Sequence, residues 1–126
     1  MRENEEKEIY PEGLRIVDIQ KTYSRLPFGL KSKKDVHAVK GIYLEVAKNE
    51  TLCLLGHNGA GKSTLFNMMT GIISSTSGSA KICGLVVGEN QDKIRQIMGV
   101  VPQFDILWDQ LTAMEHMRMF CKIKGV

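Results

Sequence analysis

One stretch, residues 52–64, limits what this chain can fold into more than any other. Its sequence is LCLLGHNGAGKST. The first four residues are mostly apolar and predict a short buried strand. The apolar residues 65–69, which follow the glycine-rich turn, predict a buried helix that Gly71 is placed to cap. A strand, a glycine-rich turn and a helix in this order form the setting of a phosphate-binding loop.

The turn fits the phosphate-binding pattern G-x-x-x-x-G-K-[ST] without mismatch, from Gly56 to Ser63. Because glycines lack a Cβ, Gly56, Gly59 and Gly61 let the backbone approach a ligand closely. The amides of such a loop can converge on an anion at the positive end of the next helix. Lys62 is then expected to reach the β- and γ-phosphates, and the Ser63 hydroxyl to ligate Mg²⁺. The alternative, a glycine-rich turn with a solvated lysine, is disfavoured because pattern and setting agree.

Length and charge bound the class of protein. The chain has 126 residues, which is one domain or part of one. Charged residues make up 25% and the net charge is +3, so neither value argues for nucleic acid as the main partner. No apolar run is long enough to cross a bilayer, and the acidic start is unlike a signal peptide. Three cysteines without a Cys-x-x-Cys pair support no zinc or redox motif and fit a reducing, cytosolic setting.

The chain divides into a tail and one folded part. Residues 1–13 carry five glutamates and are expected to form a charged, flexible tail. In residues 14–126, the β segments 14–20 and 36–46 precede the phosphate loop and predict a small antiparallel layer beside a parallel sheet. In the second segment, Ile42, Leu44 and Val46 are expected on one face, and Tyr43 and Glu45 on the other.

Later segments continue the mixture of strands and helices. Residues 79–83 and the apolar run 99–101 predict strands, and residues 90–98 predict a short helix between them. Thr112 and Glu115 form a capping box that opens a final helix. This order of elements predicts an α/β fold.

Three segments resemble the nucleotide-binding domain of ATP-binding cassette (ABC) transporters. Residues 55–64 followed by Thr70-Gly71 resemble the Walker A segment of that family, residues 76–80 its next turn and strand, and residues 101–116 its Q-loop region. The sequences of these segments most resemble subfamily A, whose members mostly move lipids or sterols. The resemblance spans residues 14–126. It implies an α/β fold with a P-loop NTPase-type parallel core sheet, a small N-terminal antiparallel β layer and the start of a helical subdomain, that is, an incomplete ABC ATPase domain.

The resemblance also implies site residues. Gln103 would be the Q-loop glutamine, which contacts the metal and the attacking water; taken alone, it reads equally as a polar loop residue. Tyr23 is placed like the aromatic residue that stacks on adenine, a role that suits an exposed ring. A strand-end packing role for Tyr23 and a competing Phe28 are the alternatives. Lys62 and Gln103 would be catalytic, and Ser63 and Gln103 would ligate Mg²⁺. The residues implied to hold the phosphates of ATP are Gly56, Asn58, Gly59, Ala60, Gly61, Lys62, Ser63 and Thr64.

Several parts of a complete ABC ATPase site are missing from the sequence. There is no apolar strand ending in Asp and followed by Glu, no Ser-Gly-Gly-Gln signature and no switch histidine. Residues 85–89 resemble the first of these superficially, but they lack the Asp and precede the Q-loop. His37, His57 and His116 are expected in surface or local hydrogen-bonding roles. The resemblance therefore implies the N-terminal portion of such a domain, and this chain alone is expected to be inactive as an ATPase.

In a complete domain, this portion would couple the binding and hydrolysis of ATP to transmembrane transport, with lipids as the implied cargo. The implied partners are a transmembrane domain, reached through the Q-loop region, and a second nucleotide-binding domain. The implied location is the cytoplasmic face of a membrane, with the anchor in another segment. Two alternatives stay open: a non-catalytic nucleotide-binding or regulatory fragment, and an unrelated phosphate-loop enzyme such as a GTPase. The absence of an Asn-Lys-x-Asp motif counts against the latter.

Overall fold

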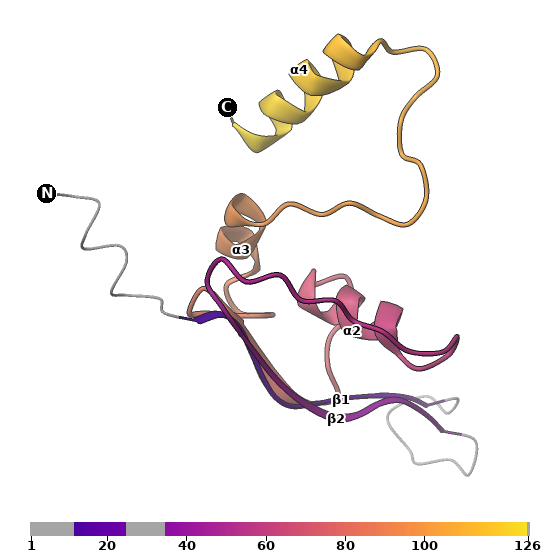
Figure 1. Ribbon diagram of the computed structural model, residues 1–126, viewed down its shortest axis with the longest axis vertical. Coiled ribbons are helices and arrows are strands. Elements are labelled where there is room, and N and C mark those ends of the chain that lie inside the picture. The colour runs from indigo at the N-terminus through magenta and orange to yellow at the C-terminus, as the bar shows by residue number, and fades with distance from the viewer. Residues whose placement is uncertain (1–11, 25–34, 126) are drawn as a thin grey trace, which may run out of the picture.

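The computed structural model describes residues 12–24 and 35–125 of the chain. The two 12-residue strands come first in the chain, and the helices of the described residues follow them (Figure 1). Of the expected tail, residues 1–11 lie outside the described residues, and the first strand already begins at Glu12. The elements in chain order are β1 (Glu12–Tyr23), β2 (Val36–Ala47), α2 (Lys62–Met69), β3 (Ser77–Ile82), β4 (Leu85–Val86), α3 (Gln91–Ile97) and α4 (Ala113–Lys124).

The sheet consists of four antiparallel strands in the order β2-β1-β3-β4. β1 pairs with β2 along its whole length, from Glu12 opposite Ala47 to Tyr23 opposite Val36. β3 pairs with the other edge of β1, and β4 forms a short hairpin with β3. The antiparallel layer expected before the phosphate loop is therefore confirmed, and β3 and β4 extend it.

The core lies between α2 and one face of this sheet (Figure 1). Leu65 and Met68 of α2 are three residues apart, so they share one face of the helix, and both are buried. Burying a side chain of this size is worth roughly 1.5–3 kcal/mol. The strand residues in the same core are Ile16, Ile19, Val39 and Ala80. This packing holds α2 on the sheet and thereby positions the loop at the N-terminus of α2.

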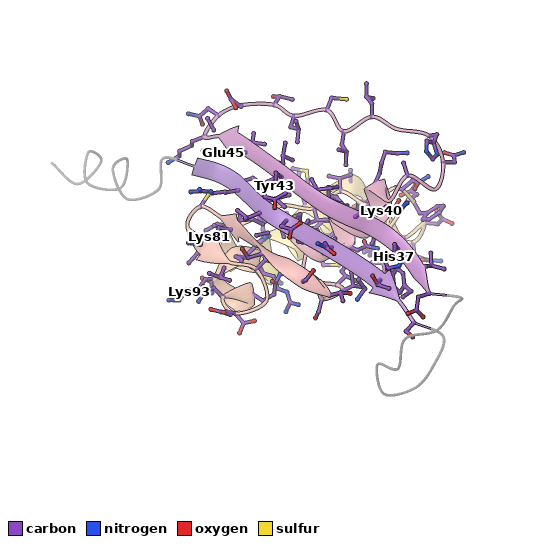
Figure 2. All side chains as sticks on the ribbon, turned by 90° about the horizontal axis from the view of Figure 1, so that it is seen from below. His37, Lys40, Tyr43, Glu45, Lys81 and Lys93 are labelled. Carbon is purple, nitrogen blue, oxygen red and sulfur yellow. The ribbon has the colours of Figure 1, made fainter. Side chains whose placement is uncertain are left out.

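The opposite face of the sheet is open to solvent (Figure 2). Tyr43 and Glu45 of β2 and Lys81 of β3 lie on it, and 69% of Tyr43 is exposed. Ile42 and Leu44, which alternate with these two positions of β2, are half-buried against the core. The alternation predicted for residues 42–46 of β2 is confirmed, because successive side chains of a strand point to opposite faces of the sheet.

The prediction of strands at residues 52–55 and 99–101 is wrong, because neither segment is a strand in the described structure. Neither segment pairs with a strand in residues 12–24 and 35–125, where every strand pair is antiparallel. Their side chains are exposed, with 84% of Leu55 and 91% of Val101 accessible. Cys53, in the first of these segments, is exposed as well. A strand forms only where a neighbour supplies hydrogen-bond partners, and an apolar sequence does not reveal whether that neighbour is present.

Two helices complete the described structure. α3 buries Ile94, and α4 begins with the predicted capping box. In this box the Glu115 amide donates to the Thr112 hydroxyl, and the Thr112 amide donates to the Glu115 carboxylate. We call residues 98–112, between the two helices, the connecting loop. None of the helices in the described ranges is both long and apolar enough to span a membrane.

Gly78, near the start of β3, sets how closely β3 approaches β1. Its φ is +78°, and a Cβ on it would meet the backbone carbonyl of Asp18. Gly78→Ala is expected to cost roughly 2–5 kcal/mol of unfolding free energy. Of this, roughly 1–2 kcal/mol comes from the left-handed conformation, and the rest from displacing packed backbone. Denaturant melts of the chain measure this loss.

The matched control is Gly88→Ala. Gly88 has a φ of +95°, but a Cβ on it meets nothing within 4 Å. This variant should therefore lose only the roughly 1–2 kcal/mol of the left-handed conformation. Equal losses in the two variants would show that the contact between β3 and β1 is not the cause.

Candidate functional site

The loop of residues 56–61 curls tightly in front of α2. The amide of Ala60 donates to the carbonyl of His57 at 3.1 Å, which closes a turn. Gly59 and Gly61 have φ values of +85° and +93°, in the left-handed region. Other residues adopt that region at a cost of roughly 1–2 kcal/mol. The backbone conformation therefore explains two of the three glycines of the sequence pattern.

Gly61 also packs against β2. A Cβ on it would meet the carbonyl of Ala38 and would lie 3.4 Å from Cγ2 of Val39. The loop thus touches the sheet directly at the residue that precedes α2. Ala38 was not among the expected site residues, because this contact exists only once α2 has packed on the sheet and no local pattern signals it.

The N-terminus of α2 is open to an anion. No side chain caps it, and its first turn carries no acidic residue. The first amides of a helix have no partner inside the helix and carry the positive end of its dipole. Ser63 is exposed at this end, and Thr64 is half-buried. Amide donors, a hydroxyl and a positive potential therefore meet in one place, which suits a phosphate group.

Lys62, the first residue of α2, folds back onto the loop. Its Nζ donates to the carbonyl of Gly56 at 2.6 Å and to the carbonyl of His57 at 2.8 Å. An ammonium bonds more strongly to an anionic oxygen than to a neutral carbonyl. The charge is thus already held at the loop, and a phosphate bound there would compete with the two carbonyls for it.

A hollow of about 360 Å³ separates the loop from β2, and its lining includes His37 and His57. Tyr23 ends β1 opposite Val36, the neighbour of His37 on β2. Tyr23 is 44% exposed, and the Lys21 ammonium lies 5.2 Å from the centre of the Tyr23 ring. The exposure agrees with a stacking role, and the ammonium makes a cation–π contact with the ring. Phe28, the competing aromatic residue, lies outside the described residues.

A family model described as "ABC transporter" matches residues 39–125, which include the phosphate loop, the connecting loop and α4. The chain belongs to the ABC transporter family. ABC transporter A family member 1 of Dictyostelium discoideum is 44% identical to it over 113 residues. ABC transporter A family member 2 of Arabidopsis thaliana is 42% identical over 120 residues. Each match covers 90% of this chain and 12% of the relative, so the chain spans a small part of the length of these ABC transporters.

Solved structures of ABC proteins share the fold. The ATP-binding subunit of an ABC transporter superposes with a TM-score of 0.72 at 24% identity, over 90% of this chain and 43% of the other. A dimeric ATP-binding cassette in a post-hydrolysis state, bound to ADP and Pi, superposes with a TM-score of 0.70 at 24% identity, over 88% and 47%. The predicted fold class is therefore confirmed as that of an ABC ATPase domain.

In this ABC family chain, the predicted site residues fall on three separate segments, the first of which is the end of β1 with Tyr23. Residues 56–64, from the Walker A resemblance, form one continuous loop and helix start. Gln103 is exposed in the connecting loop, beside an apolar groove of about 560 Å³ that includes Phe120 of α4. Across the described ranges, no hydrogen bond joins Gln103 to Lys62 or Ser63. The structure therefore places residues 56–64 together, and among the described residues no hydrogen bond joins Gln103 to them.

Proposed function

We propose that this chain is the ATP-binding portion of an ABC transporter ATPase domain, which couples the binding and hydrolysis of ATP to transmembrane transport. The observation that carries the proposal is the phosphate loop. Two left-handed glycines, an uncapped helix N-terminus and the Lys62 ammonium meet in one turn. The triphosphate of a nucleotide uses all three, because its charge is spread over several neighbouring oxygens. Membership of the ABC family supports ATP as the nucleotide.

Each part of the loop then has a task. The amides of residues 56–64, those of Asn58, Ala60 and Thr64 among them, would surround the phosphates, and Lys62 would exchange its two carbonyl partners for phosphate oxygens. The exposed hydroxyl of Ser63 fits Mg²⁺, which usually takes one or two protein ligands and completes its shell with phosphate oxygens and water. When bound, Mg²⁺ supplies positive charge against the negative charge of the phosphates. Tyr23 would stack on the base.

Gln103 is proposed to contact the metal and orient the attacking water from the connecting loop. The apolar groove beside it, with 79% of Phe104 exposed, supports docking of the parent's transmembrane domain at this loop. A second nucleotide-binding domain is the other proposed partner. We place the domain at the cytoplasmic face of a membrane, and lipid is the cargo proposed from the resemblance to subfamily A.

The test is a comparison of binding with turnover in the purified chain. We expect weak binding of MgATP and negligible phosphate release, because the acidic strand end, the signature and the switch histidine are absent from the sequence. Clear hydrolysis that Lys62→Ala abolishes would contradict the proposed incompleteness of the site. Competition between ATP and GTP is measured in parallel, and a preference for GTP would favour an unrelated GTPase instead.

A non-catalytic nucleotide-binding or regulatory fragment is the second candidate. It is favoured by one observation: the phosphate loop is fully built without any bond to Gln103. Mapping the transcript past Val126 separates the two candidates. A reading frame that continues into a signature motif supports a portion of an ATPase domain, whereas a stop codon supports the fragment.

A further inference from the structure

Two side chains of α4 hold the two ends of the connecting loop. At its start, Nζ of Lys124 donates to the carbonyls of Arg95 and Met98, at 2.7 and 2.6 Å. At its end, Nε2 of His116 lies 2.9 Å from the backbone nitrogen of Trp108. Gln103 lies between these two anchors and is exposed. The loop that carries Gln103 is therefore bonded to α4 on both sides of that residue.

The bonds of His116 determine its protonation. The backbone N–H of Trp108 can only donate, so Nε2 must be an unprotonated acceptor. Nδ1 lies 3.0 Å from the carbonyl oxygen of Thr112, which can only accept, so Nδ1 carries the proton. Only the neutral imidazole with its proton on Nδ1 makes both bonds. The side chain is also buried, with 6% of the residue exposed, so the ring is shielded from competing water.

We call the contact between His116 and Trp108 the anchor, and its other contacts are made by Trp108. Its ring stacks on the imidazole, with 6.4 Å between ring centres and 26° between planes. Its carbonyl accepts from the amide of Leu111 at 3.0 Å, so the end of the connecting loop turns around this residue.

The acidic groups near this anchor are few. On α4, Glu115 precedes His116. The backbone amide and hydroxyl of Thr112 donate to the Glu115 carboxylate and lower its pKa, with a smaller contribution from the electrostatic interaction with His116. On the loop side, Asp105 accepts from the amide of Leu107 at 3.0 Å, and Asp109 directly follows Trp108. His116 is the group of the anchor whose protonation the geometry constrains, because Nε2 must accept from Trp108 while Nδ1 donates to Thr112.

We propose that His116 is a positioning residue, which in its neutral form holds Trp108 on α4 and so sets the place of the loop that carries Gln103. Protonation of Nε2 adds a second N–H to the ring, which faces the N–H of Trp108, removes the acceptor and opens the anchor. The consequence for hydrolysis rests on the proposed function of Gln103. The contact between His116 and Trp108 does not depend on that function.

Trp108 is the only tryptophan of the chain, so its fluorescence reports on the anchor directly. In the 126-residue chain, the emission is expected to change as the pH falls from about 8 to about 5, the interval in which histidine ordinarily titrates. His116→Gln should abolish this change. Glu115 stays ionised in the interval, because its bonds to Thr112 lower its pKa from 4.5. The control is His37→Gln, an exposed histidine on β2, which should keep the change.

Amide hydrogen exchange of Trp108 is the second measurement. His116→Phe keeps an aromatic ring but has no nitrogen, so the Trp108 amide should exchange roughly fivefold faster than in the wild type, the factor of one typical hydrogen bond. His116→Gln has both a donor and an acceptor and should restore part of the protection. Equal exchange in the wild type and the Phe variant, or a fluorescence change that persists in the Gln variant, would overturn the proposal. Neither readout involves nucleotide, so such a failure would leave the proposed function untouched.

Discussion

Replacing Lys62 by alanine should lower the affinity of the chain for MgATP by roughly 10- to 100-fold. A hydrogen bond to a charged group is worth about 1.5–3 kcal/mol, and each 1.4 kcal/mol is a factor of ten in affinity. Lys62 is the first residue of α2, and its ammonium already lies at the loop carbonyls of Gly56 and His57. Among the described residues, it is the lysine whose ammonium bonds to the loop. Titration with a fluorescent ATP analogue measures the loss.

Lys93→Ala is the matched control. Lys93 is exposed on α3 and has no hydrogen bond to the loop, so its removal changes the net charge by the same amount and should leave the affinity unchanged. Thermal melts of both variants show whether the loss of the two bonds to the loop carbonyls also loosens the fold. An equal fall in affinity for the two lysines would mean that net charge alone attracts the nucleotide, and the phosphate-loop assignment would fail.

Gly61→Ala should destabilise the phosphate loop far more than Gly59→Ala. Both glycines have left-handed φ values, so an alanine at either position costs roughly 1–2 kcal/mol. A Cβ at Gly61 would also meet the backbone carbonyl of Ala38, whereas a Cβ at Gly59 meets nothing within 4 Å. Pushing the loop away from β2 costs roughly 1–3 kcal/mol more. Nucleotide binding should weaken accordingly in Gly61→Ala, because the loop and α2 must separate from the sheet.

Unfolding of the two glycine variants is measured without nucleotide. A Cβ at Gly59 would stand in the open loop where the phosphates are proposed to bind. Nucleotide affinity alone would therefore not separate a clash with the ligand from a clash with the sheet. The unfolding free energy isolates the contact with the sheet. If the two variants unfold alike, the approach of Gly61 to Ala38 contributes nothing to the loop, and the loop is held by α2 alone.

Features that depend on a few neighbouring residues were predictable from the sequence. The glycines of the phosphate-binding pattern indicate where the backbone can be left-handed, as it is at Gly59 and Gly61, because only glycine adopts that conformation without strain. Thr112 and Glu115 form their capping box from residues one turn apart. The alternation around Tyr43 follows from the geometry of a single strand. The resemblance to the ABC family rests on the same local segments, which is why it identified the fold.

Features that depend on a distant partner were decided only in three dimensions. Residues 52–55 and 99–101 are apolar enough for strands, but the described chain offers neither a neighbour with which to pair. The contact of Gly61 with Ala38 and the anchoring of Trp108 by His116 likewise join groups that no sequence period connects. Local conformation is set by each residue's own sterics and by its near neighbours in the chain. Strand pairing and burial are set by residues that are distant in the sequence, and only the folded structure shows which residues those are.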